Sequence, residues 1–367
     1  MSREAAINTA LFSSLMTITA VWAAFDARSF RMPEQVSLTD GALAKAFETH
    51  YEEHFPVKQL GVNLWAAIDY TLFREGRPGV VVGTDDWLYT DEEFNVADDA
   101  RATLHTNFAQ IAAARAALED AGVALVAALV PAKARIYPEF IAERRPAAPH
   151  DELYDELLAR LASEGIPTAD LRAPLTNGKR QHQTYFRTDT HWTPWGARIA
   201  AHEIADLTRA AGVAPDGSSD FETRVAKAAA HRGDLLNFLP LDPWFTQLLP
   251  PREAVDIMRT DITHLEGGSA PSTAAADLFG DSALPEVVLV GTSYSANPLW
   301  NFTGFLKEAL RADVASYARE GAGPFRPMLA YLKSADFREH RPRLVIWEIP
   351  ERALLMSTAT DSAAQIR

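Results

Sequence analysis

Residues 123–130, Val-Ala-Leu-Val-Ala-Ala-Leu-Val, form an unbroken apolar run that ends at Pro131. A strand without polar residues is typical of a parallel sheet that is covered on both faces. The preceding residues 101–121 carry apolar side chains at helical spacing, and Gly122 follows them as a helix-ending glycine. This part of the chain therefore predicts a helix followed by a buried parallel strand.

The same alternation continues toward the C-terminus. Helices are predicted at residues 151–163, 194–211 and 298–310, and strands at 166–169, 287–290, 314–317 and 344–349. Upstream, residues 43–72 are helix-patterned, and two short strands, 79–83 and 87–89, enclose a turn. Residues 215–285 break the rhythm and are interpreted as an insertion. The pattern predicts the α/β class, with a doubly wound, mostly parallel sheet.

Composition excludes several classes of protein. The 367 residues include 49 acidic and 35 basic side chains, a formal charge of −14, and no cysteine. A disulfide scaffold, a thiolate zinc site, an iron–sulfur cluster and cysteine catalysis are thereby excluded. The negative charge argues against nucleic acid as a partner, because such binding needs a basic footprint.

The charge is unevenly distributed. Residues 85–99 hold seven carboxylates and no Lys or Arg, which we interpret as a solvated acidic surface. Outside this stretch, Arg187 together with Lys133 and Arg135, which follow a predicted strand, leaves open a locally basic groove. The charge balance alone favours neither an acidic polymer nor a neutral one as a substrate.

The N-terminus predicts a membrane anchor. Residues 5–25 contain no charged side chain, and a helix of that length spans the hydrocarbon core of about 30 Å. We expect a cytoplasmic tip and transmembrane anchor at 1–26, a stem and helical lead-in at 27–78, and a catalytic domain at 79–360 with the insertion at about 215–285. The alternatives are a buried helix of a soluble protein and cleavage near residues 21–23.

Two short segments carry groups suited to catalysis. In residues 184–196, Asp189 and His191 are two positions apart, and an extended backbone would place both on one side. The carboxylate would then orient the imidazole. Thr193 is suited to cap the following helix, with Pro194 at its first position.

The second segment, residues 286–297, reads Glu-Val-Val-Leu-Val-Gly-Thr-Ser-Tyr-Ser-Ala-Asn. Its strand–turn–helix pattern exposes Ser293 as a candidate nucleophile. It is neither a Gly-x-Ser-x-Gly elbow nor a phosphate-binding Walker loop. A structural turn or a phosphate contact remains an alternative for this segment. For the Asp-x-His pair the alternatives are a surface hydrogen bond and half of a metal site, although the spacing to His182 and His202 fits no common zinc motif.

Together, Arg-Thr-Asp-Thr-His-Trp at 187–192 and Gly-Thr-Ser-Tyr-Ser at 291–295 resemble the alginate O-acetyltransferases of the bacterial envelope, of the AlgJ/AlgX type. The resemblance extends to residues 51–56, 79–89 and 348–352. It implies an SGNH-hydrolase-like domain in which Asp189 is the acid, His191 the base and Ser293 the nucleophile.

The resemblance also implies a function. The protein is expected to acetylate hydroxyls of an exported polysaccharide, alginate-like or another exopolysaccharide, through an acetyl-serine. Acetyl groups would come from a membrane-bound O-acyltransferase partner, and neither a cofactor nor a metal is expected. The anchor would hold the protein in the inner membrane, with the catalytic domain in the periplasm.

Several neighbours of the expected triad are candidates for binding. Arg187, Trp192 and Tyr294 are expected sugar or donor contacts, and Ser295 and Asn297 are expected near the oxyanion. Core packing is the alternative for Trp192 and Trp195. Two other functions stay open: a carbohydrate esterase with the same triad, and a non-catalytic glycan-binding component of a polysaccharide secretion complex.

Overall fold

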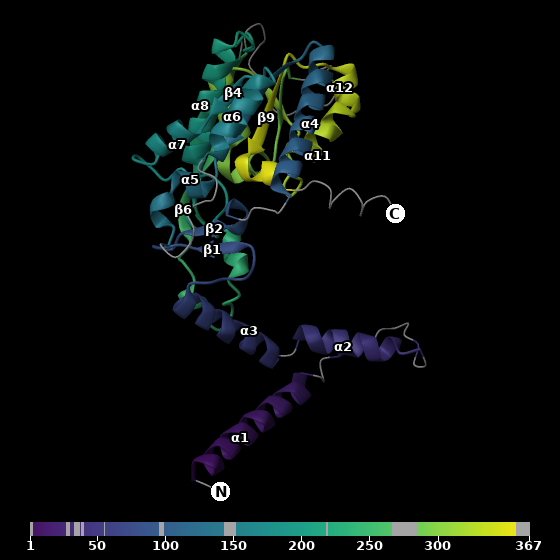
Figure 1. Cartoon of the computed structure of the whole chain (residues 1–367), viewed down its shortest axis with the longest axis vertical. Helices are drawn as coiled ribbons and strands as arrows, with labels where there is room; N and C mark the ends of the chain where they lie inside the picture. Colours follow the sequence, from purple (N-terminus) through teal and green to yellow (C-terminus); the bar gives the residue numbers. More distant parts are fainter. Residues whose placement is uncertain are drawn as a thin grey trace. The chain divides into compact units, whose positions relative to one another are not determined.

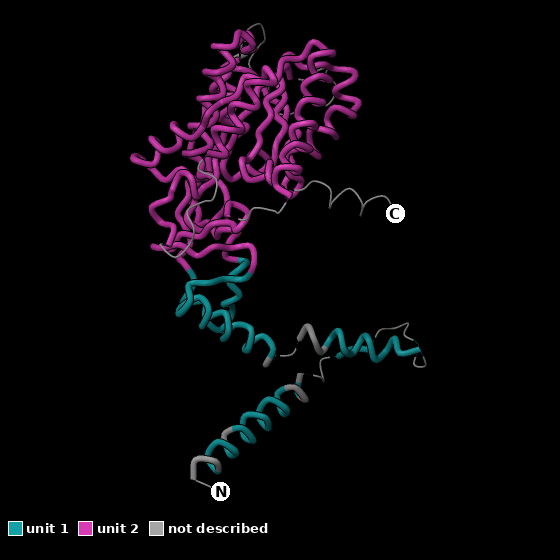
Figure 2. Tube along the Cα trace, in the orientation of Figure 1, with its two compact units in different colours: residues 1–77, 237–249 teal, residues 78–236, 250–367 magenta. Residues whose placement is uncertain are grey.

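The computed structural model describes residues 3–26, 30–32, 37, 40–54, 56–94, 99–142, 152–217, 219–265 and 285–356. The chain divides into two compact units (Figure 2). The first comprises residues 1–77 and 237–249, and the second comprises residues 78–236 and 250–367.

The first unit is helical. Its main helices are α1 (Arg3–Asp26), α2 (Ala42–His54) and α3 (Pro56–Ile68). The returning segment 237–249 is tied to α3, because the Asn63 and Gln59 side-chain amides donate to the backbone carbonyls of Pro240 and Asp242. Across the described part of the chain, no helix combines the length and the apolar character needed to cross a membrane, so the predicted anchor is not confirmed.

A five-stranded sheet forms the centre of the second unit (Figure 1). Its strands follow the order β4-β3-β9-β7-β8, and every neighbouring pair is parallel. The strands are β3 (Ala124–Val130), β4 (Thr168–Asp170), β7 (Val287–Val290), β8 (Val314–Ser316) and β9 (Leu344–Pro350). The predicted α/β class with a mostly parallel sheet is thus confirmed.

Helices flank the sheet on both sides (Figure 1). They are α4 (Ala100–Asp120), α5 (Lys133–Ile136), α6 (Leu153–Ser163), α7 (Arg172–Gly178), α8 (Pro194–Ala210), α9 (Ser293–Ala296), α10 (Phe302–Leu310), α11 (Phe325–Leu332) and α12 (Ala335–Glu339). Alternate side chains of β3 enter two different cores, since successive strand residues point to opposite faces. Val126 and Ala128 pack with α8 and α10, whereas Leu125 and Ala127 pack with α4, α6 and α11. This two-sided burial explains the unbroken apolar run in the sequence.

Two antiparallel pairs accompany the sheet. The predicted pair is confirmed as β1 (Val80–Val82) and β2 (Leu88–Thr90). The other pair, β5 (Ser219–His231) and β6 (Glu253–Leu265), lies in the region predicted only as an insertion. Most of the side chains of β5 are exposed or half-buried, so its sequence lacks the apolar signature of a core strand. Most of the predicted loop at residues 266–285 lies outside the described residues, which resume at residue 285.

The parallel arrangement determines where functional groups gather. The carboxyl ends of β3, β7 and β9 lie at one edge of the sheet, because the three strands are parallel neighbours. Lys133 follows β3, Ser293 follows β7, and Glu348 lies near the end of β9. Ligand sites of open α/β sheets are found outside this edge.

Candidate active site

Ser293 stands on a tight turn directly after β7. Thr292 caps α9 by accepting a hydrogen bond from the backbone N–H of Tyr294 at 3.3 Å. The turn approaches Glu348 so closely that a Cβ atom on Gly291 would lie 2.5 Å from the Glu348 Oε2. A side chain at position 291 would have to displace the buried carboxylate of Glu348, and the turn leaves the side chain of Ser293 half-buried rather than enclosed.

Asp189, His191 and Ser293 form a chain of hydrogen-bonded side chains, called the relay below. The Ser293 Oγ lies 2.6 Å from the His191 Nε2, although the two residues are 102 positions apart. On the other side of the ring, Nδ1 lies 2.7 Å from the Asp189 Oδ1. A carboxylate on Nδ1 selects the tautomer with its proton there, so Nε2 can accept the serine O–H. The structure thus brings together all three residues expected from the sequence.

The Asp189–His191 segment is bent, not extended as expected. An isolated antiparallel bridge between Tyr185 and Trp192 closes the loop at its base. The Asp189 Oδ1 also accepts the backbone N–H of His191 at 2.9 Å, as in an Asx turn. One carboxylate oxygen therefore holds both the backbone and the ring of His191, which explains how a spacing of two works without a strand. Thr193 caps α8, as predicted.

Aromatic rings fix the position of the imidazole. The Trp300 ring stacks on His191 with centroids 4.8 Å apart and an interplanar angle of 19°. Tyr294 packs against the same ring at 4.8 Å. The Trp300 indole N–H also donates to the backbone carbonyl of Ser293 at 3.0 Å, so one side chain positions both the base and the turn of the nucleophile.

A second histidine binds the carboxylate of Asp189. The His231 Nε2 lies 2.8 Å from the Asp189 Oδ2, and the backbone N–H of Asp234 donates to the same oxygen at 3.0 Å. Burial opposes ionisation of Asp189, but the hydrogen bonds from His191 and His231 outweigh it and hold the pKa of this carboxyl well below its usual range. Asp189 therefore remains ionised at any pH at which the relay would operate.

His231→Gln is expected to lower the turnover number about tenfold, because Asp189 loses one of its charge-assisted partners. The Michaelis constants should stay nearly unchanged, because His231 binds Asp189 and not a substrate. Steady-state kinetics of acetyl transfer measure both. His202→Gln, at an exposed position on α8, is the matched control. Equal kinetics of the two variants would show that His231 does not position the relay.

Lys133 holds the loop that carries Asp189 and His191 by hydrogen bonds to its backbone carbonyls. Its side chain is fully buried, and its ammonium donates to the backbone carbonyls of Asp189 at 2.6 Å, Phe186 at 3.1 Å and Arg187 at 3.2 Å. Burial lowers the pKa of Lys133 to about 8, against the attraction of Glu93 and other carboxylates. Glu93 is itself buried and accepts the backbone N–H groups of Lys133 and Ala134.

Two further carboxylates hold the same loop from the β5–β6 side. Glu253 accepts the backbone N–H groups of Arg187 and Thr188, each at 2.9 Å. Asp234 accepts the backbone N–H of Thr190 at 2.8 Å. Loops whose polar backbone groups are satisfied this completely keep one conformation. The relay is therefore preorganised by its own protein environment.

The locally basic groove that the sequence left open does not form from two of its three candidate residues. Lys133 is enclosed by the loop carbonyls, and Arg135 is paired with the buried Glu351 at 2.5 Å. The acidic stretch 85–99 is likewise not wholly solvated, because Glu93 is buried beneath the site. These charges serve the structure, since buried ionic groups persist only when paired.

Three of the expected substrate and oxyanion contacts also require correction. Trp192 and Tyr294 are buried in the core, where their side chains have no access to a substrate. The hydroxyl of Tyr294 donates to the Thr190 carbonyl at 2.9 Å. Ser295 is buried, and its hydroxyl donates to Glu348 at 3.0 Å, which leaves it no role at an oxyanion.

Arg187 and Asn297 keep accessible positions. Asn297 is half-buried, and its Oδ1 accepts the backbone N–H of Leu299 at 2.9 Å, so only its amide nitrogen could serve an oxyanion. The Arg187 Nε lies 3.6 Å from Glu253, and the side chain is 29% exposed. Both assignments stay predictions.

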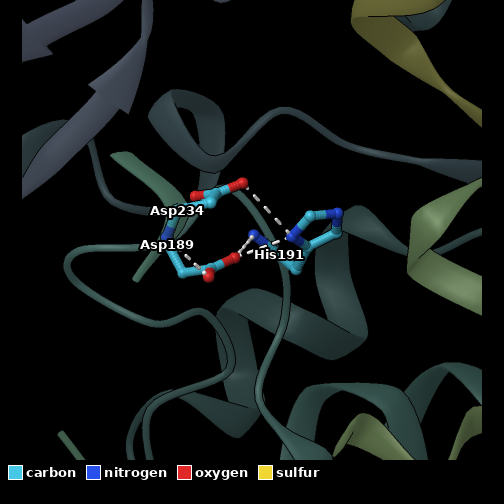
Figure 3. A group of neighbouring side chains, drawn as sticks. All are labelled: Asp189, His191 and Asp234. Carbon is cyan, nitrogen blue, oxygen red and sulfur yellow. Dashed lines mark hydrogen bonds and ion pairs between the residues drawn. The ribbon is translucent and has the colours of Figure 1, made fainter. Parts of the chain in front are cut away.

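Asp189, His191 and Asp234 are also close enough to be considered as metal ligands (Figure 3). One ligand atom from each lies within 4.8 Å of the others. The carboxylate oxygens of Asp189, however, already accept four N–H groups, and the Asp234 Oδ1 accepts from Thr190. An ion would have to displace these hydrogen bonds, so the geometry favours a hydrogen-bonded cluster.

Sequence reasoning missed four residues of this site. His231, Asp234 and Glu253 lie in the insertion, and Trp300 lies in a short 3-10 turn, η7 (Pro298–Trp300). None of the four belongs to a local motif. The sequence feature nearest to these residues is the glycine between His231 and Asp234. In the structure, a Cβ atom on this Gly233 would lie 2.0 Å from the Thr188 carbonyl.

Glu348→Gln is expected to flatten the pH dependence of stability. Burial raises the pKa of Glu348, while hydrogen bonds from Thr292 and Ser295 lower it. A raised pKa stabilises the fold at low pH, and this stabilisation is lost as the pH rises through the raised value. Glutamine is neutral at every pH, so the variant should lose less free energy of unfolding between about pH 5 and 7.5.

Denaturant titrations at the two pH values measure the effect. Glu119→Gln, on the exposed side of α4, is the control. A variant whose stability falls as steeply with rising pH as that of the unchanged protein would contradict this reading of Glu348.

Comparison with known proteins places this geometry in a family. Residues 80–351 match the family described as "SGNH hydrolase-like domain, acetyltransferase AlgX". The chain is 47% identical to a "probable alginate O-acetylase AlgJ" of Pseudomonas aeruginosa, over 95% of this chain and 89% of that protein. It is 31% identical to the "alginate biosynthesis protein AlgX" of Pseudomonas syringae, over 92% of this chain and 65% of that protein.

A solved structure agrees. The O-acetyltransferase domain of Pseudomonas putida AlgJ superposes with a TM-score of 0.69 at 41% identity, covering 78% of this chain and 95% of that one. The family match spans most of the sheet-bearing unit, including Asp189, His191 and Ser293. This chain therefore belongs to the AlgX/AlgJ family of SGNH-hydrolase-like acetyltransferase domains.

Proposed function

We propose that this protein transfers acetyl groups to hydroxyls of an alginate-like polysaccharide through an acetyl-Ser293 intermediate. The observation that carries the proposal is the continuous relay from Asp189 through His191 to Ser293, with distances of 2.7 and 2.6 Å. The relatives named alginate O-acetylase support the acetyl group and the class of acceptor.

The first half-reaction loads the serine. His191 removes the proton of the Ser293 hydroxyl while Oγ attacks the carbonyl carbon of the acetyl donor, and the proton then passes to the leaving group. Asp189 stabilises the imidazolium formed at this step, and its low pKa keeps it from taking the proton itself.

In the second half-reaction the acetyl group passes from Ser293 to the sugar. A sugar hydroxyl gives its proton to His191 and attacks the acetyl-serine, so that the ester forms on the sugar and Ser293 regains its proton. In both steps negative charge develops on the acetyl oxygen. The backbone N–H of Ser293 is available to this oxygen, because it is the first residue of α9 and has no acceptor within that helix.

Acetyl transfer to an oligosaccharide tests the proposal. The full chain is incubated with a small acetyl ester and a mannuronate oligosaccharide, and acetylated sugar is detected by mass spectrometry. Acetylated oligosaccharide in amounts that depend on Ser293 is the expected result. Release of acetate alone would indicate an esterase, and absence of both products would indicate a non-catalytic glycan-binding role.

The setting of the reaction forms part of the proposal. We propose that a membrane-bound O-acyltransferase supplies the acetyl groups, and that the protein is held at the inner membrane with the site facing the periplasm. Pull-down of the tagged full chain from membranes, and fractionation with and without residues 1–26, test the two statements separately. Recovery of the full chain in the cytoplasmic fraction would contradict the second.

A further inference from the structure

A pocket lies on the surface between α8 and the β5–β6 pair, next to the loop that carries Asp189 and His191. Its volume is about 370 Å³, within the range of small-molecule sites. Val255, Met258 and Phe305 form an apolar part of its lining, and Trp195, Arg198 and Asp256 add aromatic and charged groups. An apolar lining with a few polar side chains is the usual composition of a ligand site.

Trp195 is held in one orientation. Its indole N–H donates to the Gly178 carbonyl at 3.2 Å, and the His182 ring meets it edge-on at a centroid distance of 5.3 Å. The side chain is only half-buried. A fixed indole offers an apolar face to the C–H groups of a sugar ring at little cost in conformational entropy.

Arg198 provides a charge without a partner. It lies three residues after Trp195 on α8, so the two side chains share a helix face. Within the described part of the chain, its guanidinium forms neither an ion pair nor a hydrogen bond. An unpaired guanidinium in a half-buried position favours a carboxylate or phosphate, which it can bind with two parallel hydrogen bonds.

A carboxylate in the lining of the pocket limits which anions the pocket can bind. Asp256 contributes to the same lining and would repel a doubly charged phosphate more strongly than a single carboxylate. The carboxylate of Asp256 can instead accept hydrogen bonds from sugar hydroxyls. One guanidinium, one carboxylate and one aromatic face together suit a sugar ring that carries a single carboxylate.

The pocket and the relay share structural elements. Phe186 and Thr193 line the pocket, and they flank the loop that carries Asp189 and His191. The Phe186 ring also packs against His231 at a centroid distance of 4.6 Å. A polymer seated in the pocket would therefore lie next to the elements that hold the base.

We propose that this pocket is an acceptor subsite that binds one uronate unit of the polysaccharide, with Arg198 pairing with its carboxylate and Trp195 packing against its ring. The proposal rests on the proposed acetyl transfer for its biological meaning. The binding itself can be measured without any acetyl donor.

Calorimetric titration of the full chain with a mannuronate hexasaccharide is the direct test. Arg198→Gln should weaken binding at least about tenfold, the effect of losing one charge-assisted contact. The carboxyl-reduced, neutral hexasaccharide should bind the unchanged protein and Arg198→Gln equally weakly. Trp195→Ala should weaken the binding of both sugars. Arg101→Gln, which removes the same charge from an exposed position on α4, should leave binding unchanged.

Two results would overturn the proposal. One is equal binding of the charged hexasaccharide to the unchanged protein and to Arg198→Gln, with thermal unfolding confirming that both are folded. The other is competition by inorganic phosphate at the concentration at which the uronate binds, which would make the pocket a general anion site. Arg198→Lys, which keeps the charge without the planar fork, should restore binding only in part.

Kinetics separate this proposal from the proposed function. Arg198→Gln should raise the Michaelis constant for the oligosaccharide and leave the turnover number at saturation unchanged. Release of acetate from the small ester, measured without a sugar, depends on Asp189, His191 and Ser293 together and therefore reports on the relay separately. If the unchanged protein released no acetate, the relay would be contradicted. If it released acetate but Arg198→Gln bound the oligosaccharide as tightly as the unchanged protein, only the pocket would be contradicted.

Discussion

Ser293→Ala is expected to reduce acetyl transfer at least about a thousandfold, because the Ser293 hydroxyl is the group that the base His191 contacts. The fold should be unaffected, since the Ser293 hydroxyl contacts His191, and the turn is held by Thr292 and Glu348 instead. Mass spectrometry of the intact protein after exposure to an acetyl donor provides a second measurement. The unchanged protein should gain an acetyl group on residues 286–297, and the variant should not.

Ser163→Ala is the control for this substitution, because Ser163 is exposed at the end of α6. Thermal unfolding verifies that both variants are folded. Transfer by Ser293→Ala at more than about a tenth of the normal rate would rule out an acetyl-serine at this position. The esterase and the acetyltransferase mechanisms that use Ser293 as the nucleophile would then fail together.

Asp189→Asn is expected to lower the turnover number by about a thousandfold to ten-thousandfold, comparable to the loss of the acid in other serine triads. Asp189 accepts N–H groups from the ring and backbone of His191, from His231 and from Asp234. An asparagine amide has only one oxygen, so its NH2 group would face donors, and the imidazole would lose the carboxylate that selects its tautomer.

The same variant should lose stability in a pH-dependent way. The pKa of Asp189 is depressed in the folded protein, so its carboxylate contributes stability above the ordinary pKa of Asp, and that contribution is lost as the pH falls. The unchanged protein should therefore exceed Asp189→Asn in free energy of unfolding by a difference that is nearly constant from pH 7 to about pH 4 and narrows only below it, toward the depressed pKa of Asp189. Asp206→Asn, exposed on α8, is the control. Equal turnover of Asp189→Asn and the unchanged protein would contradict the relay.

The two halves of the candidate triad could be found in the sequence because each lies in a short local pattern, and the resemblance to the acetyltransferase family joined them. Asp189 and His191 are two residues apart, and Ser293 follows an apolar strand and a glycine turn. Even there, local reasoning assumed an extended strand, whereas the structure has a loop closed by a single bridge. The side chains of Asp189 and His191 still lie together, because the Asp189 carboxylate also accepts the backbone N–H of His191.

The residues that support the triad were not predictable in the same way. The sequence left open a basic groove that includes Lys133, yet Lys133 is the buried donor to three loop carbonyls. Trp192 was an expected substrate contact and is part of the core, whereas Trp300 was not considered and stacks on the imidazole. Burial of a polar or aromatic side chain depends on neighbours distant in sequence, and composition does not reveal them.

By itself, the sequence determined the α/β class, the alternation of helices and strands along the chain, and the two segments that supply Asp189, His191 and Ser293. These follow from hydrophobic periodicity and turn chemistry, which act over a few residues. Only the tertiary structure decided that His231 and Asp234 complete the environment of Asp189, and that the β5–β6 pair forms a pocket with α8. The physical reason is that the parallel sheet brings the carboxyl ends of strands from distant parts of the chain to one edge, and contacts made there leave no local signal in the sequence.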